Sequence, residues 1–404
     1  MASPAKLPVG QRIRYYRRKN GNRSQAAVAG LCGISERYLQ QIEAGQKIPS
    51  ADVLARLASE LGVPIASLFS DEPAAEPATA STIAPTVVRA LMGYPTLRGV
   101  DPAQPAQLRE RVQRAWQVWQ SSKDRFTRAA EILPDLIDDV EHARRNCGIS
   151  EPAVRREVLR TTADLYGLLR SYCRRAGRLD LSLMVADRAI RAAEEADDPM
   201  RVATAQWNLG HVLLSHNDAS AVDEAKEVAL MAIEQLHKAP GSTEATAIEG
   251  ALELVAVVSD ARQGRWWEAR RRLEQRAVPL AAQTGEGNVQ WTVFGPTNVE
   301  MHALSIEMLA GEAAQGLRLA DQVDLDRIPS RERRFTFTLE VARCYDLRRD
   351  DAAVLVHLLR LEDLAPEDLA RSPFAHELIL SLQKRVRPTF RRSVDELAER
   401  LNLV

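Results

Sequence analysis

The feature that most constrains this chain is the stretch from Leu108 to the C-terminus, which is rich in Ala, Leu, Arg and Glu. These residues are good helix formers. Similar segments recur within it, and three of them begin at Arg265, Gly311 and Arg349, with separations of 46 and 38 residues. Each is preceded by another helical segment and a turn. Helix pairs that repeat at roughly 34–47 residues are typical of an α-solenoid. The sequence therefore predicts an all-α fold for residues 108–404.

One segment of this stretch leaves two interpretations open. Phe335, Phe337, Leu339 and Val341 alternate with polar residues, as they would in a strand. Phe335, Leu339 and Ala342 also have the spacing of one helix face. We favour a helix because a lone strand inside a helical array would have no pairing partner.

The first 70 residues differ from the rest and predict a compact unit of five short helices. Ser24, Ser35 and Ser50 stand where they can cap the second, third and fourth helix, and Pro64 can open the fifth. Residues 71–107 follow as a Pro/Ala-rich linker, since six of the twenty prolines lie between positions 73 and 105. Within it, the segment 86–94 is apolar enough to dock on another part of the protein. The predicted domains are thus 1–70, 71–107 and 108–404.

Charge is distributed unevenly between these parts. Residues 1–70 hold ten basic and four acidic residues, a formal charge of +6, although the whole chain is at −1. The remainder is therefore at −7. Opposite signs on two parts of one chain indicate a small anion-binding head on a neutral-to-acidic body, and a polyphosphate is the obvious partner.

Several other classes of protein fit the sequence poorly. No run approaches the ~18 apolar residues of a membrane span, and the N-terminus has no signal-peptide core. The four cysteines lie far apart without a CxxC pair, which suits a cytoplasmic protein and argues against zinc or disulfides. The common nucleotide-binding and hydrolase motifs are absent. We expect no enzyme activity, no cofactor and no metal.

The segment from Arg23 to Phe69 carries the strongest functional signal. A helix, a turn containing Gly33 and a second helix form a helix-turn-helix arrangement, in which one helix reaches base edges in the major groove. Gln25 can hold a phosphate at the start of its helix. On the next helix, Arg37 can bind guanine, Gln41 adenine and Glu36 a cytosine amino group. The candidate DNA-binding residues are Gln25, Ser35, Glu36, Arg37, Tyr38, Gln40, Gln41 and Lys47.

The same segment resembles the phage-repressor-like (lambda-repressor-like) XRE family of helix-turn-helix domains. It shares with that family the SQ that opens the second helix, ISxxYLxQIExG and PSxxxLxxLAxxLGVPxxxLF, over roughly residues 8–70. The resemblance implies that Gln25 and Ser35 contact phosphates and that Glu36, Arg37 and Gln41 read bases. It also implies a structural pair between Glu43 and an arginine late in the first helix, for which we favour Arg17 over the alternative, Arg18.

Two of the candidates have alternative roles. Tyr38 is expected to pack its helix onto the core more than to contact bases, although its hydroxyl can reach a phosphate. Lys47 suits a phosphate contact and a solvated loop equally well.

The helical body offers candidate ligand-binding residues on the first helices of its pairs. Asn208 and His211 share one helix face, and Asn298 and His302 share another. An Asn amide can clamp an extended peptide because it both donates and accepts. Trp291 precedes the second pair. The alternative is a satisfied polar spot between packed helices.

Residues 291–334 resemble large actinobacterial regulators that join an XRE domain to tetratricopeptide (TPR)-like repeats. The layout is also similar to TPR-containing regulators that sense peptides. These resemblances imply a cytoplasmic transcriptional regulator whose TPR-like solenoid senses a peptide or small molecule and forms a homodimer on a palindromic site in double-stranded DNA. The alternative is an interaction scaffold whose solenoid binds a partner protein, with the head only localising it.

Overall fold

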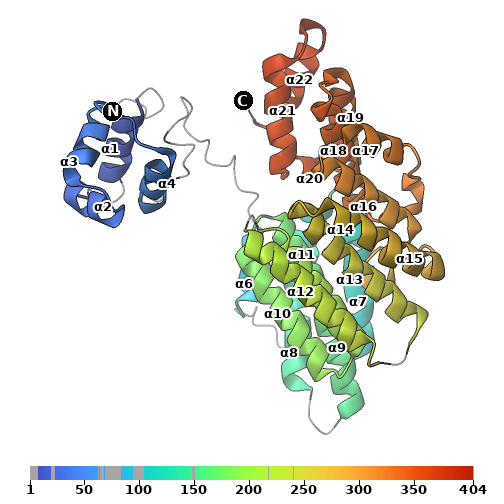
Figure 1. The fold of residues 1–404 in the computed structure, drawn as a ribbon. Coiled ribbons are helices and arrows are strands. Elements are labelled where there is room, and N and C mark those ends of the chain that lie inside the picture. The colour runs from blue at the N-terminus through green and yellow to red at the C-terminus, as the bar shows by residue number, and fades with distance from the viewer. Residues whose placement is uncertain are drawn as a thin grey trace. The chain divides into compact units, whose positions relative to one another are not determined.

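The structure of the chain is a computed structural model that describes residues 8–19, 23–61, 63, 68, 83–93, 104–147, 151–216, 218–239 and 241–403. Within these ranges every regular element is helical and no strand occurs, so the predicted all-α fold is confirmed. Contacts divide the chain into two units, Met1–Ala80 and Ser81–Val404. Figure 1 shows the helices of each unit.

The first unit contains four described helices: α1 (Val9–Lys19), α2 (Gln25–Leu31), α3 (Glu36–Glu43) and α4 (Ala51–Glu60). Ser24, Ser35 and Ser50 cap α2, α3 and α4, as predicted, because each hydroxyl accepts a hydrogen bond from a backbone N–H three residues on. The fifth helix predicted from Pro64 lies outside the described residues except for Leu68, which is buried in the core of this unit.

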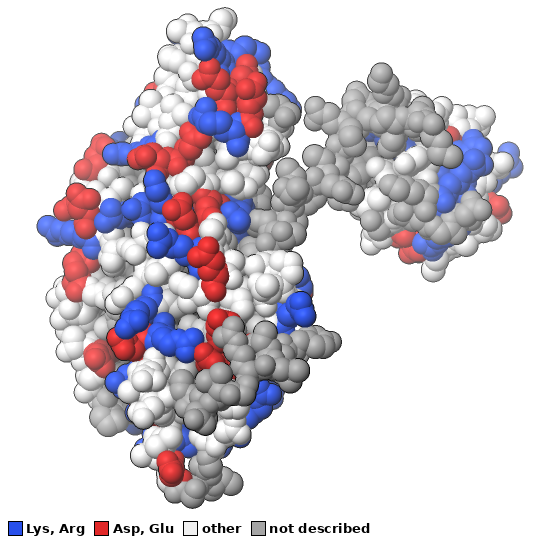
Figure 2. All heavy atoms as spheres, turned by 180° about the vertical axis from the view of Figure 1, so that it is seen from behind, with Lys and Arg blue, Asp and Glu red and all other residues white. Residues whose placement is uncertain are grey.

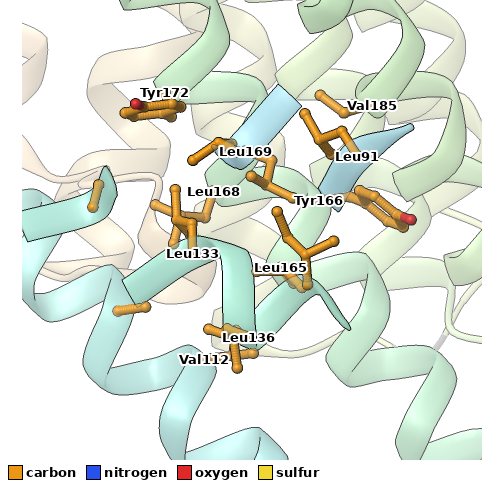
Figure 3. Packing of buried hydrophobic residues seen from close by; sticks show 14 of the residues in the cluster. Leu91, Val112, Leu133, Leu136, Leu165, Tyr166, Leu168, Leu169, Tyr172 and Val185 are labelled. Atoms are coloured by element: carbon orange, nitrogen blue, oxygen red, sulfur yellow. The ribbon is translucent and has the colours of Figure 1, made fainter. Parts of the chain in front are cut away.

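The second unit begins with a short helix, α6 (Pro85–Leu91), inside the predicted linker 71–107. Pro85 suits the first turn of α6, where its missing N–H would have no helical partner anyway. Val87 and Leu91 are buried in the same core as residues of the four helices between residues 105 and 195. Figure 3 shows Leu91 next to Val185 in this core. This part of the segment is therefore docked on the helical body.

The remaining helices follow one another along the chain with short turns. They are α7 (Pro105–Ser121), α8 (Arg125–Asn146), α9 (Pro152–Arg175), α10 (Leu179–Glu195), α11 (Pro199–Leu213), α12 (Ala219–Leu236), α13 (Thr243–Arg262), α14 (Trp266–Arg272), η2 (Leu273–Ala277), α15 (Val278–Thr284), η3 (Val289–Trp291), α16 (Pro296–Leu309), α17 (Ala313–Ala320), η4 (Leu325–Arg327), α18 (Arg331–Leu347), α19 (Asp351–Leu364), α20 (Pro366–Leu369), α21 (Pro373–Arg385) and α22 (Pro388–Arg400). No described helix is both long enough and apolar enough to cross a bilayer.

These helices form a repeat-like array. Each of α9, α11, α16 and α18 packs against the helix that follows it, and α13 packs against α14 and α15. The first helices also contact one another in order, from α9 through α11, α13 and α16 to α18, and so form one row. The segment that starts at Phe335 lies in α18, so its helical interpretation is confirmed.

The array also closes on itself, because the turn between α7 and α8 contacts α18 and α20. Arg125, at the start of α8, is fully buried and pairs with Asp368 of α20. The backbone N–H of Phe126 donates to the Glu367 carboxylate at 2.6 Å. Arg331 of α18 donates to the Leu364 carbonyl at 2.9 Å and to the Ser121 carbonyl. Residues about 240 positions apart are thereby joined.

Close packing at Gly250 of α13 gives a first testable prediction. A Cβ at this position would lie 2.0 Å from Cζ of Phe294, whose ring is itself buried. We expect Gly250→Ala to lower the free energy of unfolding by about 1–3 kcal/mol, because the ring must move. Gly241→Ala is the matched control, since nothing lies within 4 Å of its Cβ position. Urea unfolding followed by tryptophan fluorescence measures both variants, and equal midpoints would contradict the prediction.

Candidate functional site

The turn between α2 and α3 sets the geometry of the candidate site. The Ser24 hydroxyl accepts from the Ala27 N–H at 3.1 Å and the Ser35 hydroxyl from the Tyr38 N–H at 3.2 Å. Between the two caps, Gly33 has a φ of +64°, a left-handed conformation that strains residues with a side chain. The two helices are therefore joined by a short turn of defined shape, with the start of each helix exposed.

A buried ion pair fixes α3 against the rest of this unit. Arg17 of α1 binds Glu43 of α3 through two hydrogen bonds, from Nε to Oε1 at 2.7 Å and from Nη2 to Oε2 at 2.8 Å. Both residues are buried, and the hydrogen bond to Glu43 raises the pKa of Arg17. The Gln25 side chain donates to the same carboxylate at 2.7 Å, and Arg17 also donates to the Arg23 carbonyl at 2.6 Å. Glu43 thus joins α1, α2 and α3.

The candidate DNA-binding residues differ in exposure. Ser35, Glu36, Arg37, Gln40 and Lys47 are exposed, whereas Gln25, Tyr38 and Gln41 are half-buried. In the described part of the chain, no hydrogen bond or ion pair engages the side chains of Glu36, Arg37, Gln40 or Gln41. The exposed face of α3 therefore presents a carboxylate, a guanidinium and amides without a partner among the described residues.

Tyr38 and Lys47 lie together beside this face. The Tyr38 ring packs partly against the core of the unit, and Nζ of Lys47 lies 5.9 Å from the centre of that ring. Tyr38 therefore packs partly against the core, and Lys47 places an exposed cation close to its ring. Both residues stay proposals as DNA contacts.

The sequence did not single out two apolar side chains in this unit. Leu31, at the end of α2, is 64% exposed, and Ile48, in the loop after α3, is 93% exposed. Apolar side chains can contact thymine methyl groups or the sugar backbone. Leu31 stands between Gly30 and Cys32, and Ile48 between Lys47 and Pro49, so the sequence pattern gave no signal for their exposure.

The candidate ligand-binding residues of the second unit lie on the row of first helices, but most are buried. Asn208 of α11 is buried, and its side-chain oxygen accepts from Arg170 of α9. His211 lies one turn further on and packs edge-on against Trp207. Asn298 and His302 of α16 are both buried, and His302 Nδ1 lies 2.7 Å from the Asn298 carbonyl oxygen.

Trp291 sits in a constrained loop. Its ring stacks on Trp116 of α7 with centroids 5.4 Å apart, and its carbonyl accepts from Gln120 at 3.2 Å. Trp291 and the β-branched Val293 have φ values of +66° and +56°, which cost energy outside glycine. A cavity of about 20 Å³ adjoins Trp291 and Asn208, space for roughly one water molecule.

A larger cavity of about 390 Å³ lies where α6 meets α8, α9 and α10. Its lining carries charges of both signs, including Glu141, Arg144 and Arg188. These groups already have partners: Glu141 binds Arg144 and the Tyr166 hydroxyl, and Arg188 donates to the Leu91 carbonyl at 3.0 Å. This cavity depends on the docking of α6 on α8, α9 and α10, whereas the sequence predicted that the segment docks but not on which helices.

Sequence reasoning also missed a group of charged residues inside the array, on α9 and α18. It comprises Arg170, Arg174, Arg175, Glu332 and Arg333. The available signal was the density of arginines within otherwise apolar helices, at positions 170–175 and 331–334. Among the described residues, no group of three or more His, Cys, Asp or Glu side chains could hold a metal ion.

These features define the class of the first unit, which is a helix-turn-helix DNA-binding domain on an all-helical body. In agreement with this, a helix-turn-helix family model matches residues 13–68. The curated proteins contain no sequence that matches this chain. Among solved structures, the chain is similar to the crystal structure of Bacillus thuringiensis PlcR in complex with the peptide PapR7 and DNA. That match has 10% identity and a TM-score of 0.27, over 88% of this chain and 98% of that one. A TM-score this low does not establish a common arrangement.

Proposed function

We propose that this protein is a sequence-specific transcriptional regulator, in which residues 1–70 bind operator DNA and the helical body senses an effector. The observation that carries the proposal is the exposed, unpartnered polar face of α3, which the Arg17–Glu43 pair holds in place. A helix so presented can enter the major groove, where Arg37, Gln41 and Glu36 each match a different base edge.

Net charge supports the same proposal. The +6 charge of residues 1–70 provides the attraction to phosphates on which affinity depends. In the second unit, by contrast, acidic and basic side chains pair with each other, as Arg265 does with Asp223 at 2.8 Å. Figure 2 shows blue and red atoms lying side by side across one face of that unit. The body therefore offers no comparable attraction for DNA.

We further propose that the body, from residue 108 onward, is a TPR-like solenoid that dimerises and binds a peptide or small molecule. One head covers only a short site, so two heads on a palindrome supply the specificity that a regulator needs. A ligand can change DNA affinity only as far as it binds the two forms of the body differently. The row of first helices, with its buried polar side chains, supports an effector site on that side of the array.

The test is selection of DNA from a genomic library by the purified full chain, at two salt concentrations. We expect a palindromic motif to be enriched and affinity to fall steeply with salt. Failure to enrich any motif, both alone and with a cell extract that supplies the effector, would contradict the proposal. A motif without two-fold symmetry would contradict the proposed dimer but not the proposed binding of operator DNA.

Arg37→Ala gives a residue-level prediction on the selected site. We expect it to cost about 1–3 kcal/mol of binding free energy and to relax preference at one base position, because a guanidinium that binds guanine is lost. Lys47→Ala is the comparison. We expect it to lower the binding affinity equally for all sequences and to reduce the slope of log affinity against log salt concentration by about 1. Competition binding on base-substituted operators separates these results. Unchanged preference in Arg37→Ala would place the reading face elsewhere.

A further inference from the structure

The inner charged group brings together α9 and α18, which lie more than 150 residues apart in the sequence. Glu332 of α18 accepts from Arg174 Nη2 at 2.8 Å and from Arg175 Nε at 2.7 Å, both on α9. The same carboxylate accepts from Arg125 Nη1 at 3.2 Å. One carboxylate therefore serves three guanidinium groups at the place where the array closes.

Positive charge is in excess at this place. Arg125 has a second partner in Asp368, but Arg170 and Arg333 have no carboxylate at ion-pair distance among the described residues. Glu340, the next carboxylate along α18, does not correct the imbalance, because burial raises its pKa to about 7. Buried charges without a counterion are costly, so this arrangement favours binding of an anion.

Unpartnered polar atoms surround the excess charge. Arg170 is 3% exposed, and among the described residues neither its Nε nor Nε of Arg174 has a hydrogen-bond partner. Within the same part of the chain, His211 Nε2 on α11 and the side-chain oxygen of Asn298 on α16 also lack a partner. Most buried polar atoms in proteins are hydrogen-bonded, so a set of orphans on α9, α11 and α16, three helices of one row, points to a missing ligand.

The arginines of α9 and α18 also act electrostatically on histidines of α11 and α16. Burial and the nearby Arg174 lower the pKa of Arg170 well below its usual range. Burial, Arg333 and Arg170 lower the pKa of His211. Burial and Arg333 lower the pKa of His302, one turn from Asn298, to about 3. The histidines are therefore neutral near pH 7, and the positive charge is carried by arginines.

We propose that Arg170, Arg174 and Arg333 bind an oxyanion of the effector, a carboxylate or a phosphate, between α9 and α18. His211 on α11 and Asn298 on α16, which carry the other unpartnered polar atoms, supply hydrogen bonds to the uncharged part of the ligand. The assignment rests on the proposed sensing role of the body and names the chemistry of its effector. Guanidinium groups suit both oxyanions because their N–H groups match two oxygens at once.

Binding of such an anion would also act on the closure of the array. A ligand held by both α9 and α18 adds a contact between the beginning and the end of the array, next to Glu332. It thereby favours the closed form over any form in which these helices separate. The effector would therefore bind the closed form of the body more tightly than the other forms, which is the difference in affinity that regulation requires.

The experiment is calorimetric titration of the full chain without DNA, using two probes at constant ionic strength. One probe is inorganic phosphate, and the other is N-acetyl-trialanine with either a free or an amidated C-terminus. We expect saturable binding of phosphate, of the free-acid peptide, or of both, and none of the amide. Phosphate binding alone indicates a phosphorylated effector, and binding of the free acid alone a peptide C-terminus or similar carboxylate.

Variants identify the site. We expect Arg333→Ala to weaken binding at least tenfold and Arg333→Lys to retain part of it, since Lys keeps the charge. Arg271→Ala, which removes an exposed charge of the same unit, should leave binding unchanged. Arg333 has no ion-pair partner in the described residues, so its loss should not unfold the protein, which a thermal melt verifies. Absence of saturable binding to both probes, or full affinity in Arg333→Ala, would overturn the site. Because DNA selection is measured separately, these outcomes leave the proposal of operator binding intact.

Discussion

Arg17→Ala is expected to unfold the DNA-binding unit while leaving the helical body intact. The substitution leaves Glu43 buried without its cation, and removal of one partner from a buried pair costs about 3–5 kcal/mol. It also removes the contact of Arg17 with the Arg23 carbonyl. For a unit of this size such a loss is a large part of its whole stability. Operator binding should therefore be lost.

The positions of the tryptophans allow the unfolding of the two units to be measured separately. All six tryptophans lie in the second unit, the first of them at position 116. Tryptophan fluorescence in urea therefore follows the body alone, while far-UV circular dichroism follows both units. We expect Arg17→Ala to shift the unfolding of the first unit, which only circular dichroism detects, to lower urea concentration. The fluorescence transition of the body should stay unchanged. Arg18→Ala, an exposed neighbour with the same change of charge, should stay within about 0.5 kcal/mol of the native protein. Equal stability of the two variants would show that the pair is dispensable.

Glu332→Gln is expected to destabilise the body by about 3–5 kcal/mol. The amide keeps the shape of the side chain but leaves Arg174 and Arg175 without a carboxylate, and Arg125 with only Asp368. The midpoint of the fluorescence transition should move to a lower urea concentration. At low urea concentration, the first unit should still bind operator DNA. Glu268→Gln, an exposed residue of α14, is the control. A Glu332→Gln midpoint equal to that of the control would mean that the arginines find other partners.

The Glu332 carboxylate also predicts that the stability of the body depends on pH. Burial would raise the pKa of Glu332, but Arg175, Arg125, Arg174 and Arg333 outweigh it and hold the pKa well below its usual range. A carboxyl group with a lowered pKa contributes its full stability above its unfolded value, near pH 4.3, and loses it as the pH falls through the folded value. The difference between the native protein and Glu332→Gln should therefore be constant near neutral pH and shrink in strong acid.

Local signals in the sequence predicted the parts of this fold that depend on near neighbours. The serine caps at Ser24, Ser35 and Ser50 need only a few residues of context, and the structure shows all three. The helix that contains Phe335 likewise followed from its spacing and from the lack of a strand partner. The resemblance favoured Arg17 over Arg18 as the partner of Glu43, and the structure shows that contact, although the choice depends on how α1 rotates against α3.

Features that join distant residues could not be predicted. Asn298 was correctly placed on a first helix, but its burial depends on helices from elsewhere in the array. The contact of Glu332 with Arg174 has no pattern in the sequence, because neither residue carries a signal for the other. The apolar character of residues 86–94 predicted that this segment docks, but nothing in the sequence indicated on which helices Val87 and Leu91 of α6 pack.

The contacts between α8 and α20 bear on how this protein is made. Helices that pack on their immediate successors can form while the chain is still being synthesised, and so can a small N-terminal unit whose described hydrogen bonds join residues at most 37 positions apart. Arg125, however, meets Asp368 only after 243 further residues have left the ribosome. Its other partner, Glu332, lies 207 positions away, so until that residue emerges the charge of Arg125 has neither of its two carboxylates. The array thus remains incomplete until nearly the last helix has emerged, and a nascent chain that stalls earlier exposes that unfinished edge to chaperones and proteases.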